Sequence, residues 1–392
     1  MIVREIALSD TTKFIVDNRG KTVPIVDDGI QLIATNCINN DNLYPVYENV
    51  RFISEETYEN WFRAHPIPND IILTLKGSQN GAVCLVPDPV DFVIAQDMVA
   101  LRADEKIISP YYLFAALRST YVQFQIKNLD VSGIIPHLKK GDFSQLFLPY
   151  PEIGIRNFIG DIYFNMSRKI DLLHRQNKTL EALAETLFRQ WFIEEAQDDW
   201  EEKQLDEIAT FLNGLACQKF PPKNRVNRLP VLKIKDLKSG LSDSSDWATN
   251  EVDQKYIVEN GDVIFSWSAS LIVKVWDGEK CVLNQHLFKV TSDKYPKWFI
   301  YLWTKYHLAR FIAIAETKAT TMGHIRRNDL AGAKVRVPSK SGMKDFDKIF
   351  GPLIDKLIAN NLQIKTLTKT RDTLLPKLMS GAVRVRYEGS SE

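Results

Sequence analysis

Two short motifs in the sequence place a histidine next to a pair of cations, as His137-Leu138-Lys139-Lys140 and His324-Ile325-Arg326-Arg327. Lys and Arg side chains attract the phosphates of nucleic acids, and such contacts supply affinity without reading the bases. The histidines also suit hydrogen-bonded turns, because a general base needs an oriented partner that a sequence does not reveal. The motifs therefore indicate either a phosphate-docking surface that occurs twice or a repeated structural turn.

Short polar residues follow two apolar segments, residues 69–74 and 261–266, each of which has an aspartate at its second position. Such side chains on rigid loops can reach base edges in a DNA groove. Together with the basic motifs they give the candidate DNA-contacting residues. In the first half these are Lys76, Ser78, Gln79, Asn80, Lys127, His137, Lys139 and Lys140; in the second half they are Ser266, Ser268, Ser270, Lys274, Lys318, Thr320, Thr321, His324, Arg326 and Arg327.

A third pattern, Asp88 with Asp104 and Lys106, resembles the carboxylates and lysine with which nucleases hold Mg²⁺ and activate water. The second half has Ser292-Asp293-Lys294-Tyr295 at the corresponding place, without the lysine. A duplicated Mg-dependent nuclease acting on its own is therefore the alternative function. The sequence has neither a G-x-G-x-x-G motif nor the Asn-Pro-Pro-aromatic signature of adenine methylation. We assign no catalytic residue, metal ligand or cofactor to this chain.

Composition limits the possible partners and compartment. Fifty Lys and Arg against 49 Asp and Glu leave a net charge of +1, so any DNA surface must be local. The four cysteines form no C-x-x-C pair, which argues against a zinc ribbon and favours reduced thiols in the cytoplasm. No long apolar run or signal peptide is present, so we expect a cytoplasmic protein with no membrane role.

The sequence contains an internal repeat. Residues 137–187 match residues 324–374 at a constant offset of 187 without a gap. The match continues upstream, where Ala95-Gln96-Asp97 faces Asn284-Gln285-His286 and Val3-Arg4-Glu5-Ile6-Ala7 faces Leu205-Asp206-Glu207-Ile208-Ala209. Each copy is predicted to run from short strands and turns into one long helix.

The two predicted long helices carry apolar residues at alternating steps of four and three, the pattern of a coiled-coil seam. Seven or eight turns would span roughly 35 to 40 Å, and Pro376 should end or kink the second helix near Leu375. Asn177 and Asn360 on the seam would fix the register of an antiparallel pair, whereas Glu181 is placed on the solvent side. The alternative is that each helix only covers its own domain. The seam consists of Met166, Ile170, Leu173, Asn177, Leu180, Leu187, Leu353, Leu357, Asn360, Ile364, Leu367 and Leu374.

The repeat and the paired helices predict two tandem domains in a pseudo-two-fold internal repeat, separated by two long antiparallel coiled-coil helices. The predicted parts are a first recognition domain at residues 1–155, a central spacer helix at 156–197, a second recognition domain at 198–345, a C-terminal spacer helix at 346–380 and a tail at 381–392.

Over its whole length the chain resembles the specificity subunits of Type I restriction-modification systems. The most specific pieces are Leu374-Leu375-Pro376-Lys377-Leu378-Met379-Ser380-Gly381, Phe188-Arg189-Gln190-Trp191-Phe192, Asn284-Gln285-His286 and Thr320-Thr321-Met322-Gly323-His324-Ile325. The first copy departs from two of these, with Ala95-Gln96-Asp97 and Ser132-Gly133-Ile134-Ile135-Pro136-His137.

The resemblance implies a non-catalytic DNA-binding subunit in which each of the two tandem domains is an α/β (α+β) recognition domain. Each recognition domain would read one half of a split site on double-stranded DNA, and the helices would set the spacing. Two methyltransferase subunits would bring S-adenosylmethionine and methylate adenine at N6, and motor-nuclease restriction subunits would use ATP and Mg²⁺ to translocate and cut. A third hypothesis, a pure scaffold that binds only proteins, predicts no salt-dependent DNA binding.

Overall fold

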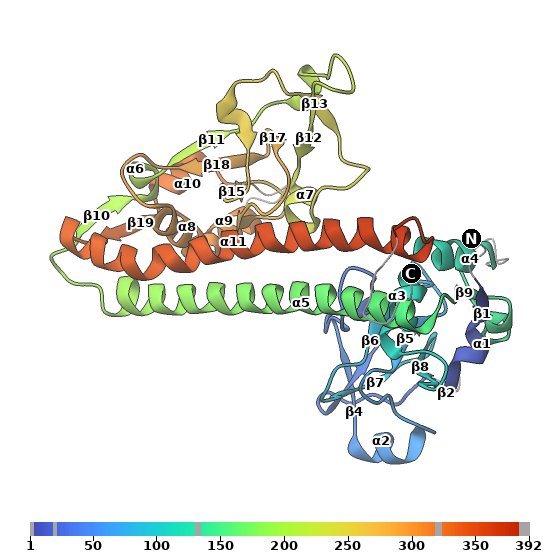
Figure 1. Ribbon diagram of the computed structural model, residues 1–392. Helices are drawn as coiled ribbons and strands as arrows, with labels where there is room; N and C mark the ends of the chain where they lie inside the picture. The colour runs from blue at the N-terminus through green and yellow to red at the C-terminus, as the bar shows by residue number, and fades with distance from the viewer. Residues whose placement is uncertain (1–3, 19–21, 130–134, 318–323, 384–392) are drawn as a thin grey trace. The chain divides into compact units, whose positions relative to one another are not determined.

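The computed structural model describes residues 4–18, 22–129, 135–317 and 324–383. The chain forms two compact units (Figure 1): unit 1 comprises Met1–Leu172 and Thr366–Glu392, and unit 2 comprises Leu173–Lys365. Among the described residues, no helix combines the length and apolar character needed to cross a bilayer.

The described residues of unit 1 form three small sheets. The largest has the antiparallel order β2 (Thr12–Asp17), β8 (Met98–Ala103), β5 (Ile71–Thr74) and β6 (Val83–Leu85). The others are β4 (Arg51–Ile53), β3 (Ile30–Ile33) and β7 (Phe92–Ile94), and the pair β1 (Glu5–Ala7) and β9 (Phe147–Pro149). Every residue of β5 is buried, as expected for a central strand covered on both faces.

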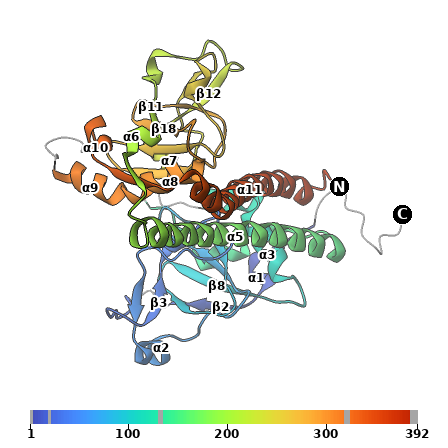
Figure 2. The same ribbon diagram turned by 90° about the vertical axis from the view of Figure 1, so that its left-hand side faces the viewer.

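The helices of unit 1 pack against these sheets. They are α1 (Leu8–Thr11), α2 (Glu55–Trp61), α3 (Pro110–Arg118), α4 (Thr120–Leu129) and the first part of α5, with the 3-10 turns η1 (Thr35–Cys37) and η2 (Lys140–Ser144). Ser109 caps α3 by accepting a hydrogen bond from the Tyr112 amide, and Pro110 occupies the first turn. Almost the whole of α3 is buried against the sheet, while α2 lies at the end of unit 1 away from α5 (Figure 2).

Unit 2 has the same strand order. Its four-stranded antiparallel sheet is β11 (Thr210–Asn213), β18 (Leu287–Thr291), β15 (Val263–Ser266) and β16 (Ile272–Val275). The second sheet is β13 (Trp247–Thr249), β12 (Arg228–Leu232), β17 (Cys281–Leu283) and the additional β14 (Ile257–Val258), and the pair is β10 (Glu201–Gln204) with β19 (Lys334–Val337). Its helices are α6 (Leu205–Ile208), α7 (Ile234–Ser239), α8 (Lys297–Tyr306), α9 (Leu308–Thr317), α10 (Arg327–Ala331), η4 (Cys217–Lys219) and η5 (Gln254–Tyr256).

Two long helices each have residues in both units. The helix α5 (Ile153–Arg189) has 37 residues and continues into a π-helical turn, η3 (Gln190–Glu194), and α11 (Lys340–Met379) has 40 residues. Ser339 caps α11, because its hydroxyl accepts a hydrogen bond from the Gly342 amide at 3.2 Å. At 1.5 Å per residue the helices are about 55 and 60 Å long. The predicted 35 to 40 Å was therefore too short, because it counted only the turns with a clear heptad pattern.

Pro376 does not end α11 at Leu375, so that part of the prediction is wrong. The helix runs on to Met379 and ends where Gly381 takes a positive φ of 71°. Proline removes one amide hydrogen from the last turn, but Leu375, Leu378 and Met379 on this turn are buried in the core of unit 1. Packing therefore keeps this turn helical although proline disfavours it.

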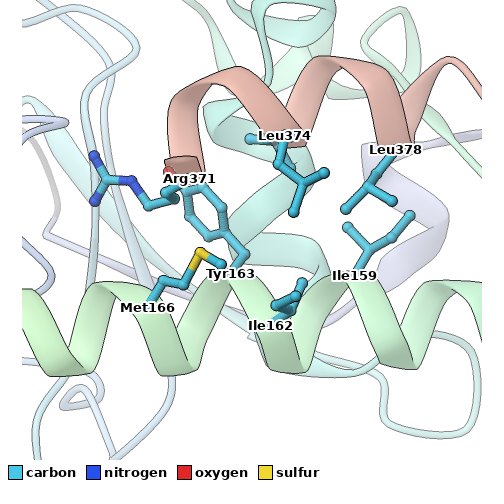
Figure 3. Close-up of a pocket in the computed structure, with 8 residues that line it drawn as sticks. Ile159, Ile162, Tyr163, Met166, Arg371, Leu374 and Leu378 are labelled. Carbon is cyan, nitrogen blue, oxygen red and sulfur yellow. The ribbon is translucent and has the colours of Figure 1, made fainter. Parts of the chain in front are cut away.

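Within unit 1, the start of α5 packs against the end of α11. Figure 3 shows Ile159, Ile162 and Met166 of α5 facing Leu374 and Leu378 of α11, around a small void of about 10 Å³. Arg371, 5% exposed, lies beside this cluster and donates to Ser167 Oγ at 3.4 Å. Because Arg371 pairs with Ser167 and Leu378 lies by Ile159, the two helices are antiparallel here.

Within unit 2, the end of α5 packs against the start of α11 through a polar contact. Asn360, 1% exposed, donates to Asn177 Oδ1 at 2.8 Å and to Gln176 Oε1 at 2.9 Å, and Asn177 donates to Asn361 Oδ1. Further along, Trp191 meets Phe350 edge to face. All twelve predicted seam residues are buried or half-buried.

Replacing Asn360 with leucine is expected to raise the free energy of unfolding by about 1 kcal/mol. The Oδ1 atom of Asn360 is buried and has no hydrogen-bond partner among the described residues, which is costly for a polar atom. The same change should loosen the register of the helix pair, as a seam asparagine specifies register at the expense of stability. Urea denaturation checks the first effect, with Gln363→Leu at an exposed position as control. A loss of stability in Asn360→Leu would show instead that its hydrogen bonds dominate.

Glu181 is not on the solvent side as predicted. It accepts hydrogen bonds from Lys305 Nζ at 2.5 Å and from the Tyr301 hydroxyl, both on α8. Lys305 also pairs with Glu185 at 2.5 Å. Burial alone would raise the pKa of Glu181, but the hydrogen bond and charge of Lys305, with the Tyr301 hydroxyl, outweigh it and lower that pKa. The heptad pattern could not reveal this contact, because α8 lies more than a hundred residues further along the chain.

Removing the Lys305 cation should make the stability of unit 2 depend less on pH. A lowered carboxylate pKa contributes stability above the unfolded value near 4.3, and this stability is lost as the pH falls through the folded value. We expect Lys305→Met to lower the free energy of unfolding by roughly 1 kcal/mol at pH 7, discounted for partial exposure, and by less at pH 3. Lys348→Met, which breaks the exposed pair with Asp345, is the control and should have almost no effect. Equal losses at both pH values would contradict the role given to Glu181.

Candidate nucleic-acid interface

In unit 1, backbone hydrogen bonds join three segments that the sequence singled out separately. The turn after β5 meets the loop before β8, where the Leu75 amide donates to Asp97 O at 2.8 Å. It also meets the histidine segment, where the Leu138 amide donates to Leu75 O at 2.8 Å and the Gly77 amide to Pro136 O at 3.0 Å. We call residues 75–81, 95–98 and 135–140 the unit 1 loop cluster.

The unit 1 loop cluster carries polar and cationic side chains on turns that are joined by backbone hydrogen bonds. Ser78 and Gln79 are exposed, Lys76 and Asn80 are half-buried, and Lys139 and Lys140 are exposed. Lys140 forms an ion pair with Asp17. The turn needs glycine at position 81, where φ is +85° and a Cβ atom would approach Ile126 of α4 to 3.0 Å. Lys127 lies on the exposed side of the same helix, which therefore borders the cluster.

In unit 2, the equivalent segments meet in the same way. The Trp267 amide donates to His286 O at 3.4 Å, and the Ile325 amide donates to Trp267 O at 3.1 Å. Ser268 and His324 form an isolated antiparallel bridge, as Lys76 and His137 do in unit 1. We call residues 267–271, 284–287 and 324–327 the unit 2 loop cluster.

The unit 2 loop cluster contains an aromatic and imidazole group that sequence reasoning missed. His286 lies just before β18, and its Nδ1 lies 3.2 Å from Ser268 Oγ while its Nε2 lies 3.3 Å from Gln285 Nε2. The half-buried Trp267 ring lies 5.9 Å from the His286 ring and 6.3 Å from the His324 ring. Its Nε1 donates to Asn213 Oδ1 at 3.1 Å, which holds the indole in place. The sequence did contain one signal for this group, namely an aromatic residue, Trp267, between two serines, Ser266 and Ser268.

The structure corrects the prediction for Ser266. Its side chain is fully buried, and its hydroxyl donates to the Ser270 carbonyl, so it supports the turn and does not face solvent. Ser268 is 6% exposed and is engaged with His286, whereas Ser270 is exposed. Lys274 points from β16 to Asp277 in an ion pair of 2.9 Å. Lys318, Thr320 and Thr321 lie outside the described residues.

Both basic motifs sit on the same structural turn. The Asp142 carboxylate accepts the Lys139 amide at 2.9 Å, and the Asp329 carboxylate accepts the Arg326 amide at 2.7 Å. Leu138 and Ile325 are buried beneath these turns. The apolar residue and the aspartate thus account for the turn, whereas the exposed side chains of Lys139, Arg326 and Arg327 are not needed to form it. The side chains of these recurring cations are therefore available for contacts other than those that form the turn.

Asp104, one member of the possible nuclease triad, has a structural contact. Its carboxylate accepts the Lys106 amide at 3.1 Å. In unit 2 the Ser292 hydroxyl accepts the Lys294 and Tyr295 amides at the equivalent turn, at 3.3 and 3.2 Å. The shared feature of the two copies is therefore a side-chain oxygen that caps a turn. Within the described ranges, no three His, Cys, Asp or Glu side chains gather as a metal site would require.

Comparisons with known proteins agree with this architecture. The family described as Type I restriction modification DNA specificity domain matches residues 27–182 and again residues 197–369. The Type I restriction enzyme MjaIX specificity subunit of Methanocaldococcus jannaschii is 24% identical over 345 residues, which cover 81% of this chain and 78% of that protein. The HindI specificity subunit of Haemophilus influenzae is 20% identical over 397 residues, covering 80% and 86%.

A solved structure has the same fold. The crystal structure of the S subunit of a Type I restriction-modification system from M. genitalium aligns with a TM-score of 0.56 at 17% identity, over 96% of this chain and 95% of that one. The two family matches fall one in each half of the sequence, which confirms the prediction of two tandem domains. The chain therefore belongs to the Type I restriction-modification DNA specificity family.

Proposed function

We propose that this chain is the DNA-binding specificity subunit of a Type I restriction-modification complex and that each unit reads one half of a bipartite site. The observation that carries the proposal is the recurrence of the loop cluster. In both units the same three segments meet, and a solvent-exposed cation pair follows the histidine. The remaining side chains of the two clusters differ. Lys76 of unit 1 corresponds to Ser268 of unit 2, and Asp97 corresponds to His286. Shared phosphate contacts with different base contacts would produce this pattern.

We also propose that α5 and α11 act together as an antiparallel coiled coil related by a pseudo-two-fold repeat. The antiparallel contacts within each unit support this, because Ser167 meets Arg371 in unit 1 and Asn177 meets Asn360 in unit 2. The coiled coil would set the interval between the half-sites and dock two methyltransferase subunits. Recognition elements that dock on one face of DNA are spaced by about one helical turn, or 34 Å.

In this proposal the chain itself is non-catalytic. S-adenosylmethionine, ATP and Mg²⁺ would be bound by the methyltransferase and restriction subunits. The polar and cationic groups of the loop clusters suit phosphates and base edges, which need hydrogen-bond donors and acceptors at fixed positions. Asp104 at its turn-capping position gives no reason to prefer the nuclease alternative.

Co-purification with candidate methyltransferase subunits, followed by DNA binding across a range of salt concentrations, tests the proposal. We expect specific DNA to bind with an affinity that falls steeply as salt increases, since phosphate contacts release counterions. Absence of salt-dependent binding in the assembled complex would favour the scaffold hypothesis. Plasmid cleavage by the purified chain with Mg²⁺ alone, lost on Asp104→Ala, would favour the nuclease.

A further inference from the structure

Unit 2 carries a basic arm that the candidate interface does not include. The arm, residues 218–228, connects η4 to β12 and contains four cations and no carboxylate: Lys219, Lys223, Arg225 and Arg228. Three aromatic or apolar side chains beside these cations are exposed, with Phe220 at 37%, Trp247 at 40% and Val226 at 85%. Views at right angles place β12 at the end of unit 2 away from α11 (Figures 1 and 2), and β13 pairs with it. The arm is therefore a local positive surface on a chain whose net charge is close to zero.

Hydrogen bonds at both ends support the basic arm, although most of it faces solvent. The Phe220 carbonyl accepts the Thr249 amide at 2.9 Å, which ties the arm to β13. Asn224 Oδ1 accepts the amides of Val226 and Asn227 at 2.9 and 2.7 Å, which fixes the bend at its tip. Two consecutive prolines restrict the segment between these points. A pre-ordered surface loop loses little entropy on binding, so this arrangement suits a contact surface.

The cations of the arm are largely uncompensated. Lys223 pairs with Glu251 at 2.6 Å, but Lys219, Arg225 and Arg228 form no ion pair with any residue that the structure describes. The Arg228 guanidinium lies over the Trp247 ring at 3.8 Å. Stacking occupies the face of a guanidinium and leaves the donors at its edge available for two parallel hydrogen bonds to a phosphate. The stack thus presents a phosphate donor in a fixed position.

The corresponding connection in unit 1 lacks this charge. Residues 18–29, which join β2 to β3, contain two cations, Arg19 and Lys21, balanced by Asp27 and Asp28. If this connection were only a structural turn shared by the two copies, its charge would be similar in both, as it is in the two histidine motifs. The arm is therefore a feature that only unit 2 has acquired.

The arm is continuous with the unit 2 loop cluster. Leu215, just before η4, accepts the Gln285 amide at 2.8 Å, and Leu215 donates its own amide to Leu283 at 2.9 Å. A polar cleft of about 450 Å³ between them is lined by Gln218 and Trp247 from the arm side and by Asn284 from the cluster. Asp243 and Asp246 also line it, and Asp246 forms an ion pair with Lys233. Burial raises the pKa of the Cys217 thiol in this cleft to about 11, so at neutral pH the thiol adds no charge to that of the two carboxylates.

We infer that the basic arm is a second DNA-binding element, which clamps backbone phosphates next to the half-site read by unit 2. The inference rests on the proposed function, because the loop cluster must bring DNA to this side of unit 2. Double-stranded DNA fits better than an acidic protein segment, since regularly spaced phosphates match cations spread along an extended loop. The sequence of the corresponding connection in unit 1 has no net positive charge, so we infer that the two half-sites are held with unequal backbone contact.

The experiment compares the assembled complex with one that carries Lys219→Gln, Arg225→Gln and Arg228→Gln. The three changes leave the Lys223–Glu251 pair intact. We expect the slope of log affinity against log salt to fall by two to three, at about 0.9 per lost phosphate contact. Base preference should be unchanged at both half-sites, and hydroxyl-radical footprinting should lose protection only beside the half-site of unit 2. Lys294→Gln, Lys297→Gln and Lys340→Gln make the matched control, with the same change of charge on exposed residues of unit 2.

The possible outcomes distinguish the proposed role of the arm from the proposed function of the whole chain. An unchanged salt slope and footprint in the arm variant, with normal binding by the wild type, would overturn the inference and leave the proposed function standing. Loss of the methyltransferase subunits on co-purification would also overturn it, because the arm would then contact protein. A wild-type complex that shows no salt-dependent binding would instead refute the proposed function.

Discussion

Replacing Arg326 and Arg327 with alanine is expected to weaken DNA binding by the assembled complex roughly 100-fold. Each charge-assisted hydrogen bond contributes about 1.5 kcal/mol, and every 1.4 kcal/mol changes affinity tenfold. The two side chains are exposed on the unit 2 loop cluster, and the turn beneath them is formed by the Asp329 carboxylate and the buried Ile325. Their removal should therefore leave the fold intact.

The loss should be nearly the same for every DNA sequence, because phosphate contacts carry little base information. The slope of log affinity against log salt should also fall by about two. Lys344→Ala with Lys348→Ala, two exposed cations on α11 outside the loop clusters, serves as the control for a change of net charge. If binding instead weakened only for sites altered at particular bases, Arg326 and Arg327 would be base-reading residues and the assignment to phosphates would be wrong.

Deleting one heptad from each long helix should shorten the gap between the two recognised half-sites by about three base pairs. Seven helical residues span about 10 Å, and each base-pair step is about 3.4 Å. The segments to remove are 174–180 and 357–363, which contain Asn177 and Asn360 and contact each other in unit 2. A whole heptad keeps the same helix face on the seam, so the remaining contacts are preserved. Mapping the methylated adenines made by the assembled complex measures the gap.

The matched control replaces the same fourteen positions with a different sequence of the same heptad pattern, which should leave the gap unchanged. The half-site bases should stay the same in both variants. A change in the bases recognised would mean that the helices contact DNA directly. An unchanged gap after the deletion would show that something other than α5 and α11 sets the spacing.

The duplication and the long helices could be predicted from sequence because both depend on periodicity. A constant offset of 187 aligns His137–Leu187 with His324–Leu374, and these segments end in α5 and α11. The seam positions follow from the alternation of four and three residues. Local signals also located the turns of the loop clusters, since each follows an apolar strand and carries polar residues and glycine or serine.

Features that depend on distant contacts were not predictable. Pro376 stays within α11 because Leu375, Leu378 and Met379 are packed in the core, which local rules for proline do not include. Ser266 is buried and its hydroxyl donates to the Ser270 carbonyl, although a serine at the end of a strand usually suggests an exposed turn. His286 gains Ser268 as a partner only when the loop before β18 meets the turn after β15. The charge of the basic arm was visible in the sequence, but its supporting hydrogen bonds and the Arg228–Trp247 stack appear only in the structure.

The most direct test of the account exchanges the turn of one loop cluster and asks which bases change. In the assembled complex, residues 267–271 would be replaced by the equivalent turn of another family member with a different DNA site, and methylated adenines and flanking base preferences would be mapped. We predict that the recognised sequence consists of two blocks separated by a fixed interval and that the exchange alters only one block. A single uninterrupted recognition sequence, or a change in both blocks at once, would contradict the claim that each unit reads its own half-site.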